Sequence, residues 1–213
     1  MTFGAFLNAF NMIKPVHRLQ ALLARTLNTT SSAPGLALVF VLGLIVLPAC
    51  LLGAAALASR AWGQTGERRL ADNAMRYVYA LAPLGFGMWL AHYGFHFLTG
   101  GLTIVPVIQS FLADVGLFGG KVQWGLGALV PSEWLFPIEA VLLYLGAFGS
   151  IVAAFQIARN RAPADEPEAR RAILGAALPW ILVVLLLLCF GLWIMLQPME
   201  MRGTLQMVGG TRG

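Results

Sequence analysis

The residues best suited to chemistry are two histidines, His92 and His96, inside a long apolar stretch. They are four residues apart, so on a helix they share one face. That spacing can present both imidazoles to one metal ion. It suits a bis-histidine haem poorly, because axial ligands approach the iron from opposite sides, although one histidine could bind haem b with a second ligand from another helix. The structural alternative is a pair of interhelical hydrogen bonds, to Tyr93 or to a nearby carboxylate.

Other polar side chains are predicted at the same end of the molecule. Ionisable groups inside the membrane are costly and usually functional, and a carboxylate at the depth of Glu139 needs a partner or must be protonated. We therefore predict a cofactor-binding group of His92, His96 and Glu139. We also predict a set of metal ligands: His92, His96, Met199, Glu200 and Met201. Imidazole and thioether ligands together favour copper, whereas imidazole and carboxylate favour iron, zinc or protons. The structural alternative for the two methionines is interfacial packing.

The elements that must position these residues follow from the composition. Of 213 residues, 59% are hydrophobic and 11% are charged, against about 25% charged in soluble domains. The mean hydropathy is +0.78. These values exclude an ordinary cytosolic protein, a disordered chain and a disulfide-stapled domain. The net charge of +5 resides mostly in short loops, so it indicates membrane topology and no nucleic-acid partner.

Four apolar runs are long enough to cross a lipid bilayer, which takes about 20 residues. The sequence thus predicts an all-α, polytopic membrane helical bundle. The predicted spans are roughly residues 35–59, 76–98, 134–157 and 173–196, with a kink at Pro48 in the first. Small residues at short spacing predict close contacts between helices: Ala49 with Gly53, Gly85 with Gly87, and Gly146 with Ser150.

The bundle is predicted over residues 34–204, with an amphipathic surface segment at 1–33 and a tail at 205–213. Apolar residues recur at helical spacing after Pro15, with polar and basic residues between them, which predicts a helix at the membrane surface. Residues 103–116 carry a second apolar face and predict a short helix on the outer surface. The alternative for that segment is a re-entrant or packed element that caps the bundle.

The arginines predict an orientation. The loops after the first and third spans are rich in arginine, whereas residues 99–133 contain only Lys121. By the positive-inside rule, the arginine-rich loops face the cytoplasm, and residues 99–133 and both termini face outward. Lys14, Arg18 and Arg25 oppose this orientation. Tyr77 and Tyr79 are predicted to lie in the inner interfacial belt.

The two cysteines, Cys50 and Cys189, each lie inside an apolar run, and the sequence has no CxxC motif. The chain therefore cannot ligate an iron–sulfur cluster by itself or form a zinc knuckle. Both are predicted to be small, buried apolar residues.

Four stretches together resemble a known family. They are LAPLGFGMWLAHYGFHFLTG at 81–100, TIVPVIQSFLADVG at 103–116, WLFPIEAVLLYLGAFGS at 134–150 and WIMLQPMEMRGT at 193–204. They resemble the C-terminal membrane portion of the FesM-type bacterial membrane iron–sulfur proteins, which are linked to respiratory or photosynthetic electron flow. The ferredoxin-like cysteine motifs that precede this portion in the family are missing. The resemblance implies a bacterial inner (cytoplasmic) membrane protein whose iron–sulfur half is lost or lies on another subunit.

The expected function is that of a non-catalytic integral subunit of an energy-transducing electron-transfer complex. It would anchor or stabilise partner subunits, among them an iron–sulfur or cytochrome subunit. Two alternatives use the residues above. A copper- or haem-handling protein would use His92, His96, Met199 and Met201. A quinol-binding subunit would use His92 or Glu139 to accept a quinol proton.

Overall fold

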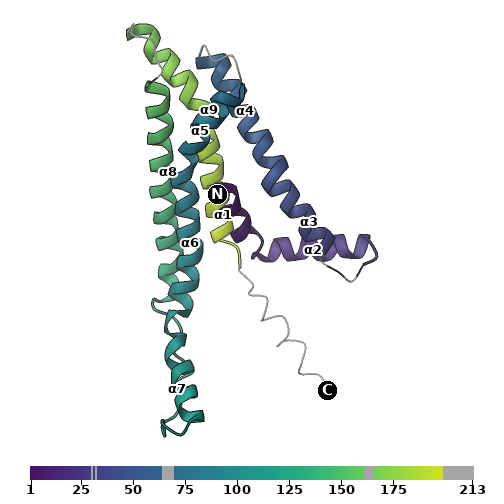
Figure 1. Ribbon diagram of the computed structural model, residues 1–213, viewed down its shortest axis with the longest axis vertical. Coiled ribbons are helices and arrows are strands. Elements are labelled where there is room, and N and C mark those ends of the chain that lie inside the picture. The colour runs from purple at the N-terminus through teal and green to yellow at the C-terminus, as the bar shows by residue number, and fades with distance from the viewer. Residues whose placement is uncertain (30, 32, 64–69, 161–165, 199–213) are drawn as a thin grey trace.

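The structure is a computed structural model that describes residues 1–29, 31, 33–63, 70–160 and 166–198. Across these residues the regular elements are helices and no strand occurs, which confirms the all-α prediction. The long helices run side by side (Figure 1). The α-helices are α1 (Thr2–Phe10), α2 (Lys14–Thr26), α3 (Ala33–Val41), α4 (Leu47–Gly63), α5 (Leu70–Val78), α6 (Ala82–Gly100), α7 (Ile104–Asp114), α8 (Leu135–Arg159) and α9 (Glu166–Met195).

Short turns of other helix types join several of these into longer rods. A π-helical turn (Leu42–Val46) links α3 to α4, and 3-10 turns lead into α6 (Tyr79–Leu81), α7 (Gly101–Thr103) and α8 (Ser132–Trp134). Four of the resulting rods are long and apolar enough to cross a membrane: Ala33–Gly63, Leu70–Asp114, Ser132–Arg159 and Ala169–Met195. They contain the four predicted spans to within one residue, so the multi-pass prediction is confirmed.

Helices α6 and α8 run antiparallel and make the most extensive contact between two helices in the bundle. A Cβ on Gly87 would lie 2.7 Å from the carbonyl oxygen of Leu142 and 3.3 Å from the Cα of Gly146. Only glycine allows two helix backbones to approach this closely. One turn away, the backbone N–H of Leu84 donates to the hydroxyl oxygen of Ser150 at 3.0 Å. The predicted small-residue contacts at Gly87, Gly146 and Ser150 are therefore present, whereas Gly53 has nothing within 4 Å of its Cβ position.

A second seam joins α4 to α9 near the end of the bundle where α8 also ends (Figure 1). The Ser59 hydroxyl donates to the carbonyl oxygen of Ala176 at 2.9 Å. Beside it, the ring of Tyr77 stacks on Trp180 with centroids 5.0 Å apart, and both residues are fully buried. The belt prediction is thus wrong for Tyr77, because its ring packs against Trp180 in the core. Tyr79 is 70% exposed, as a belt residue should be.

The irregularity predicted at Pro48 takes the form of the π-helical turn that ends two residues before it. Proline has no N–H and clashes with the carbonyl four residues earlier, so a wider turn before it relieves the conflict. Leu47 closes that turn by donating its N–H to the carbonyl of Leu42. We refer to α3, the π turn and α4 together as the arm. The arm leans away from the rest of the bundle at its α3 end (Figure 1).

Helix α1 lies inside the bundle, although residues 1–33 were predicted to be a surface segment. Phe6, Leu7 and Ala9 are buried. The Thr2 hydroxyl donates to the carbonyl of Leu81 at 3.0 Å, and Thr2 is the neighbour that a Cβ on Gly85 would meet. The predicted helical spacing begins only at Pro15, so this helix was not predicted separately from the surface segment.

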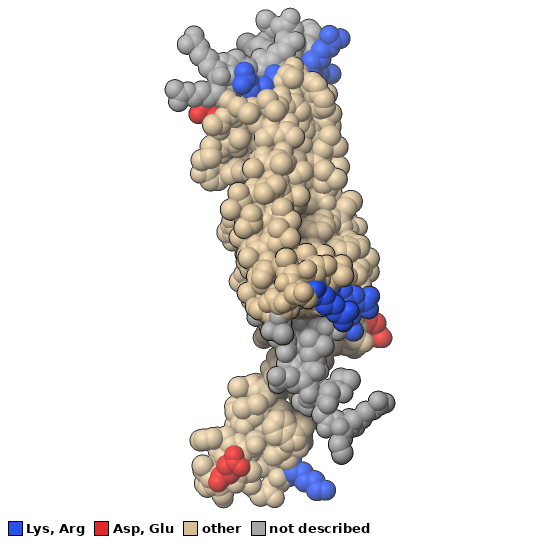
Figure 2. Space-filling model, turned by 90° about the vertical axis from the view of Figure 1, so that its right-hand side faces the viewer, with Lys and Arg blue, Asp and Glu red and all other residues tan. Residues whose placement is uncertain are grey.

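Helix α2 matches the predicted amphipathic helix and crosses the end of α3 at a steep angle (Figure 1). Its first residue bonds to the segment that follows α9, because the Lys14 N–H donates to the carbonyl of Pro198 at 3.1 Å. Lys and Arg gather around α2 and again at the opposite end of the bundle, with mostly uncharged surface between them (Figure 2). We call these ends the α2 end and the arginine-rich end. The described arginines of the latter are Arg60, Arg76, Arg159, Arg170 and Arg171.

Candidate functional site

His92 and Glu139 are placed by the contact of α6 with α8. The Leu84–Ser150 hydrogen bond and the Gly87–Gly146 approach fix the antiparallel register of the two helices. Counting along α6 to His92 and back along α8 reaches Glu139 within one helical turn. His92 is 2% exposed and Glu139 is 3% exposed. Both polar side chains therefore point into the protein at nearly the same depth.

The two histidines face each other on α6. Their ring centroids are 5.0 Å apart and their planes are nearly perpendicular, at 88°. The Tyr93 ring lies edge-on to His92 at 5.3 Å, and its hydroxyl accepts a hydrogen bond from the Asn8 amide of α1 at 3.3 Å. His96 is only half-buried. The predicted shared face is thus present, with His92 inside the bundle and His96 nearer its surface.

Two polar atoms at this depth are buried and have no hydrogen-bond partner: Nδ1 of His92 and Oε1 of Glu139. Buried polar atoms are nearly always paired, and an unpaired one costs several kcal/mol in an apolar surrounding. Both groups exchange protons and form strong hydrogen bonds. His92, with His96 beside it, and Glu139 can therefore each bind a small polar group or take up a proton within the membrane.

The metal site predicted around these residues is not tested by the structure. Among the described residues, no three His, Cys, Asp or Glu side chains come together as metal ligands would. Met199, Glu200 and Met201 lie outside the described residues. The described end of α9 does reach the α2 end, at Pro198. The copper ligand set therefore stays a prediction.

A second buried polar group lies toward the arginine-rich end and was not predicted. Asn73 of α5 is fully buried, and its side-chain amide donates to the carbonyl of Ala56 on α4 at 3.1 Å. Oδ1 of Asn73 and Nε1 of Trp180 have no hydrogen-bond partner. The sequence signal that could have revealed this group is the position of Asn73 on the apolar face of α5, a helix that also carries charged residues. The amide joins α5 to α4, which is a structural role.

Both cysteines are exposed on the surfaces of spanning helices, Cys50 on α4 and Cys189 on α9. They lie on different helices and face outward, where lipid covers a spanning helix. The prediction that both are buried is therefore wrong, because each lies on the outer surface of its helix.

No family model, curated protein or solved structure matches this chain. Its class therefore rests on its own architecture. An all-α chain with four spanning helices, long apolar surfaces and charges gathered at two ends is a multi-pass membrane protein.

Proposed function

We propose that the chain is an integral membrane subunit of a bacterial electron-transfer complex, and that it holds a partner subunit through helix α7. The single observation that carries this proposal is the placement of α7. The helix projects past the α2 end of the bundle in line with α6 (Figure 1). Several of its apolar side chains are exposed.

Length arithmetic supports a position of α7 outside the lipid. The rod Leu70–Asp114 has 45 residues and measures about 68 Å, whereas Ser132–Arg159 has 28 residues and measures about 42 Å. A bilayer with its headgroups is about 40–45 Å thick. The shorter rod therefore fits the membrane, and about 25 Å of the longer one extends beyond it.

The exposed face of α7 has the spacing of a helix-in-groove contact. Ile104, Ile108 and Phe111 are 57%, 50% and 64% exposed and succeed one another at steps of four and three residues. The following loop covers another side of the helix, because the Gln123 N–H donates to the Gln109 side chain at 2.9 Å. An apolar stripe left open in this way marks a protein contact.

The partner is a redox subunit on the same side of the membrane as α7. The resemblance of residues 81–100, 103–116, 134–150 and 193–204 to a membrane iron–sulfur family supports an iron–sulfur or cytochrome subunit. The chain carries no cysteine motif for a cluster, so electron transfer takes place on the partner. The chain supplies the membrane anchor and the docking helix, without catalytic activity of its own.

Affinity purification from bacterial membranes in a mild detergent tests the proposal. The full chain should co-purify with redox subunits in fixed ratio. Phe111→Asp should abolish that recovery, because it places a charge in the centre of the apolar face. Ser110→Asp is the matched control, since it adds the same charge one residue away on a half-buried position of α7.

The outcomes separate cleanly. Loss of partners with Phe111→Asp alone supports docking through α7. A chain that purifies without redox subunits refutes the proposal, as does an equal recovery of partners from both variants. If α7 of the isolated chain instead lies in lipid, a fluorophore attached at Ile108 will have a membrane-like emission spectrum, and docking through this face is then excluded.

A second function, quinol binding, is favoured by the unpaired atoms of His92 and Glu139. The hydroxyl groups of a quinol head group can donate to a carboxylate or an imidazole nitrogen, and either can accept the proton. Ubiquinone or menaquinone added to the purified chain should then perturb the NMR signals of His92. No change in those signals would exclude this second function.

A further inference from the structure

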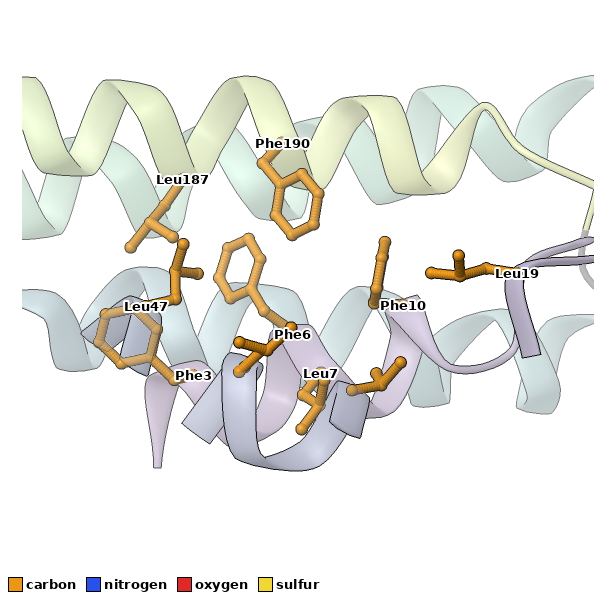
Figure 3. Close-up of a pocket in the computed structure, with 11 residues that line it drawn as sticks. Phe3, Phe6, Leu7, Phe10, Leu19, Leu47, Leu187 and Phe190 are labelled. Atoms are coloured by element: carbon orange, nitrogen blue, oxygen red, sulfur yellow. The ribbon is translucent and has the colours of Figure 1, made fainter. Parts of the chain in front are cut away.

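An apolar cleft separates the arm from α1 and α9. Its volume is about 310 Å³, at the lower end of the range for small-molecule sites. Phe3, Phe6 and Phe10 of α1 line it along one side, and Phe190 and Leu187 of α9 line the other. Leu19 of α2 lies at one end (Figure 3). Every lining side chain is a hydrocarbon, so the cleft suits an alkyl chain.

The cleft runs along α1 and the spanning helix α9. Its lining residues succeed one another along α1 and α9, from Leu19 at one end to Phe3 and Leu187 at the other (Figure 3). From Phe3 to Phe10 the distance along α1 is about 10 Å, a large part of one lipid leaflet, which is about 15 Å thick. An acyl chain that enters beside α2 would follow this direction naturally.

The π-helical turn of the arm forms part of the wall. Leu42 and Gly43 of this turn line the cleft, and the Cβ position of Gly43 lies 2.7 Å from Cδ1 of Leu7. A side chain at residue 43 would therefore displace the Leu7 side chain, which also lines the cleft. Single π turns inside helices often occur at functional sites.

The mouth of the cleft lies at a basic helix. Helix α2, which contributes Leu19, carries Lys14, His17, Arg18 and Arg25 and no acidic residue. Arg18 is exposed and adjacent in sequence to Leu19. Cations at a membrane surface attract anionic headgroups. A quinone offers an alkyl tail without an anion, whereas an anionic phospholipid offers both groups.

We propose that this cleft binds one acyl chain of an anionic phospholipid, whose phosphate lies against α2. The lipid fills the space between the arm and α1 and so fixes the arm to the bundle. The site is separate from the His92 cluster and from α7, and it does not depend on the proposed function.

Native mass spectrometry of the full chain in detergent tests this proposal, with phosphatidylglycerol and phosphatidylcholine as probes. The wild-type chain should retain one phosphatidylglycerol molecule more strongly than phosphatidylcholine. Leu42→Trp should fill the cleft and lower retention of both lipids by about tenfold, since several methylene groups lose their burial. Leu44→Trp is the matched control, because it is an equally exposed leucine on the same turn that does not line the cleft.

A second pair of tryptophan variants lies on α2, so it tests the same cleft without changing the arm. Leu19→Trp on α2 should also lower retention, whereas Leu22→Trp, an exposed leucine of the same helix outside the cleft, should not. Arg18→Gln should weaken phosphatidylglycerol by about fivefold and leave phosphatidylcholine unchanged. Arg159→Gln, at the arginine-rich end, is the control for charge alone.

Three results would overturn the proposal. The first is equal retention of phosphatidylglycerol by the members of both tryptophan pairs. The second is equal weakening by Arg18→Gln and Arg159→Gln, which would indicate general attraction to the charged protein. The third is a wild-type chain that retains both lipids equally, or that carries an isoprenoid quinone displaced by Leu42→Trp.

Discussion

The backbone N–H of Leu84 donates to the hydroxyl of Ser150 across the α6–α8 interface, at 3.0 Å. Leu84 lies near the start of α6, where the first backbone N–H groups of a helix need partners from outside it. The hydroxyl supplies one such partner. The bond also fixes the register that brings His92 level with Glu139, so it couples the fold to the candidate site.

Ser150→Ala should lower the stability of the purified chain by about 1 kcal/mol, because a buried N–H loses its acceptor. The measurement is the thermal unfolding midpoint in detergent. Ser110→Ala on α7 serves as the control and should leave the midpoint unchanged. Equal midpoints for Ser150→Ala and the wild-type chain would show that this bond does not hold the two helices.

Gly146→Ala should destabilise the bundle by about 1–3 kcal/mol, since its Cβ would lie 2.8 Å from the carbonyl oxygen of Pro83. Gly53→Ala is the matched control, because nothing lies within 4 Å of that Cβ position. It should be neutral or stabilising, as alanine favours a helix. Denaturant titration followed by circular dichroism compares the two variants. The reverse order would contradict close packing of α6 on α8.

His92→Ala and Glu139→Ala should each impair assembly or activity of the host complex more than Cys50→Ala or Cys189→Ala. The first two residues are buried at the helix interface, and the two cysteines are exposed on the helix surfaces. Native gel electrophoresis and turnover of the complex provide the readout.

Glu139→Leu separates a functional role from a packing role. Leucine keeps a similar volume and removes the unpaired Oε1 atom, so the isolated chain should become more stable by about 1 kcal/mol or more. If the carboxyl group binds a ligand or a proton, activity of the complex should fall at the same time. A stable variant with full activity would leave Glu139 without a function.

A topology reporter fused after Gly213 should behave as non-cytoplasmic, and one inserted near Ala164 as cytoplasmic. The physical reason is the larger number of arginines at the end where α4 and α8 terminate. Alkaline phosphatase and green fluorescent protein fusions measure the two states. The opposite result at either position would refute the orientation or the four-span arrangement.

The sequence by itself determined the helical class, the four spans, the amphipathic helix at α2 and the helix at α7. These features depend on local hydrophobicity and on apolar residues that recur with a period of 3.6. Both properties are determined by residues close together in the sequence. The His92–His96 face follows in the same way. Only the tertiary structure decided the rest, because it depends on which helices meet and at what register. It brought α1 into the bundle and buried Tyr77 against Trp180. The similar depth of His92 and Glu139 was already predicted by counting residues along antiparallel spans, and the structure added the α6–α8 contact that fixes it. It also left the face of α7 open and formed the cleft beside the π turn, since a groove between helices exists only after they have packed.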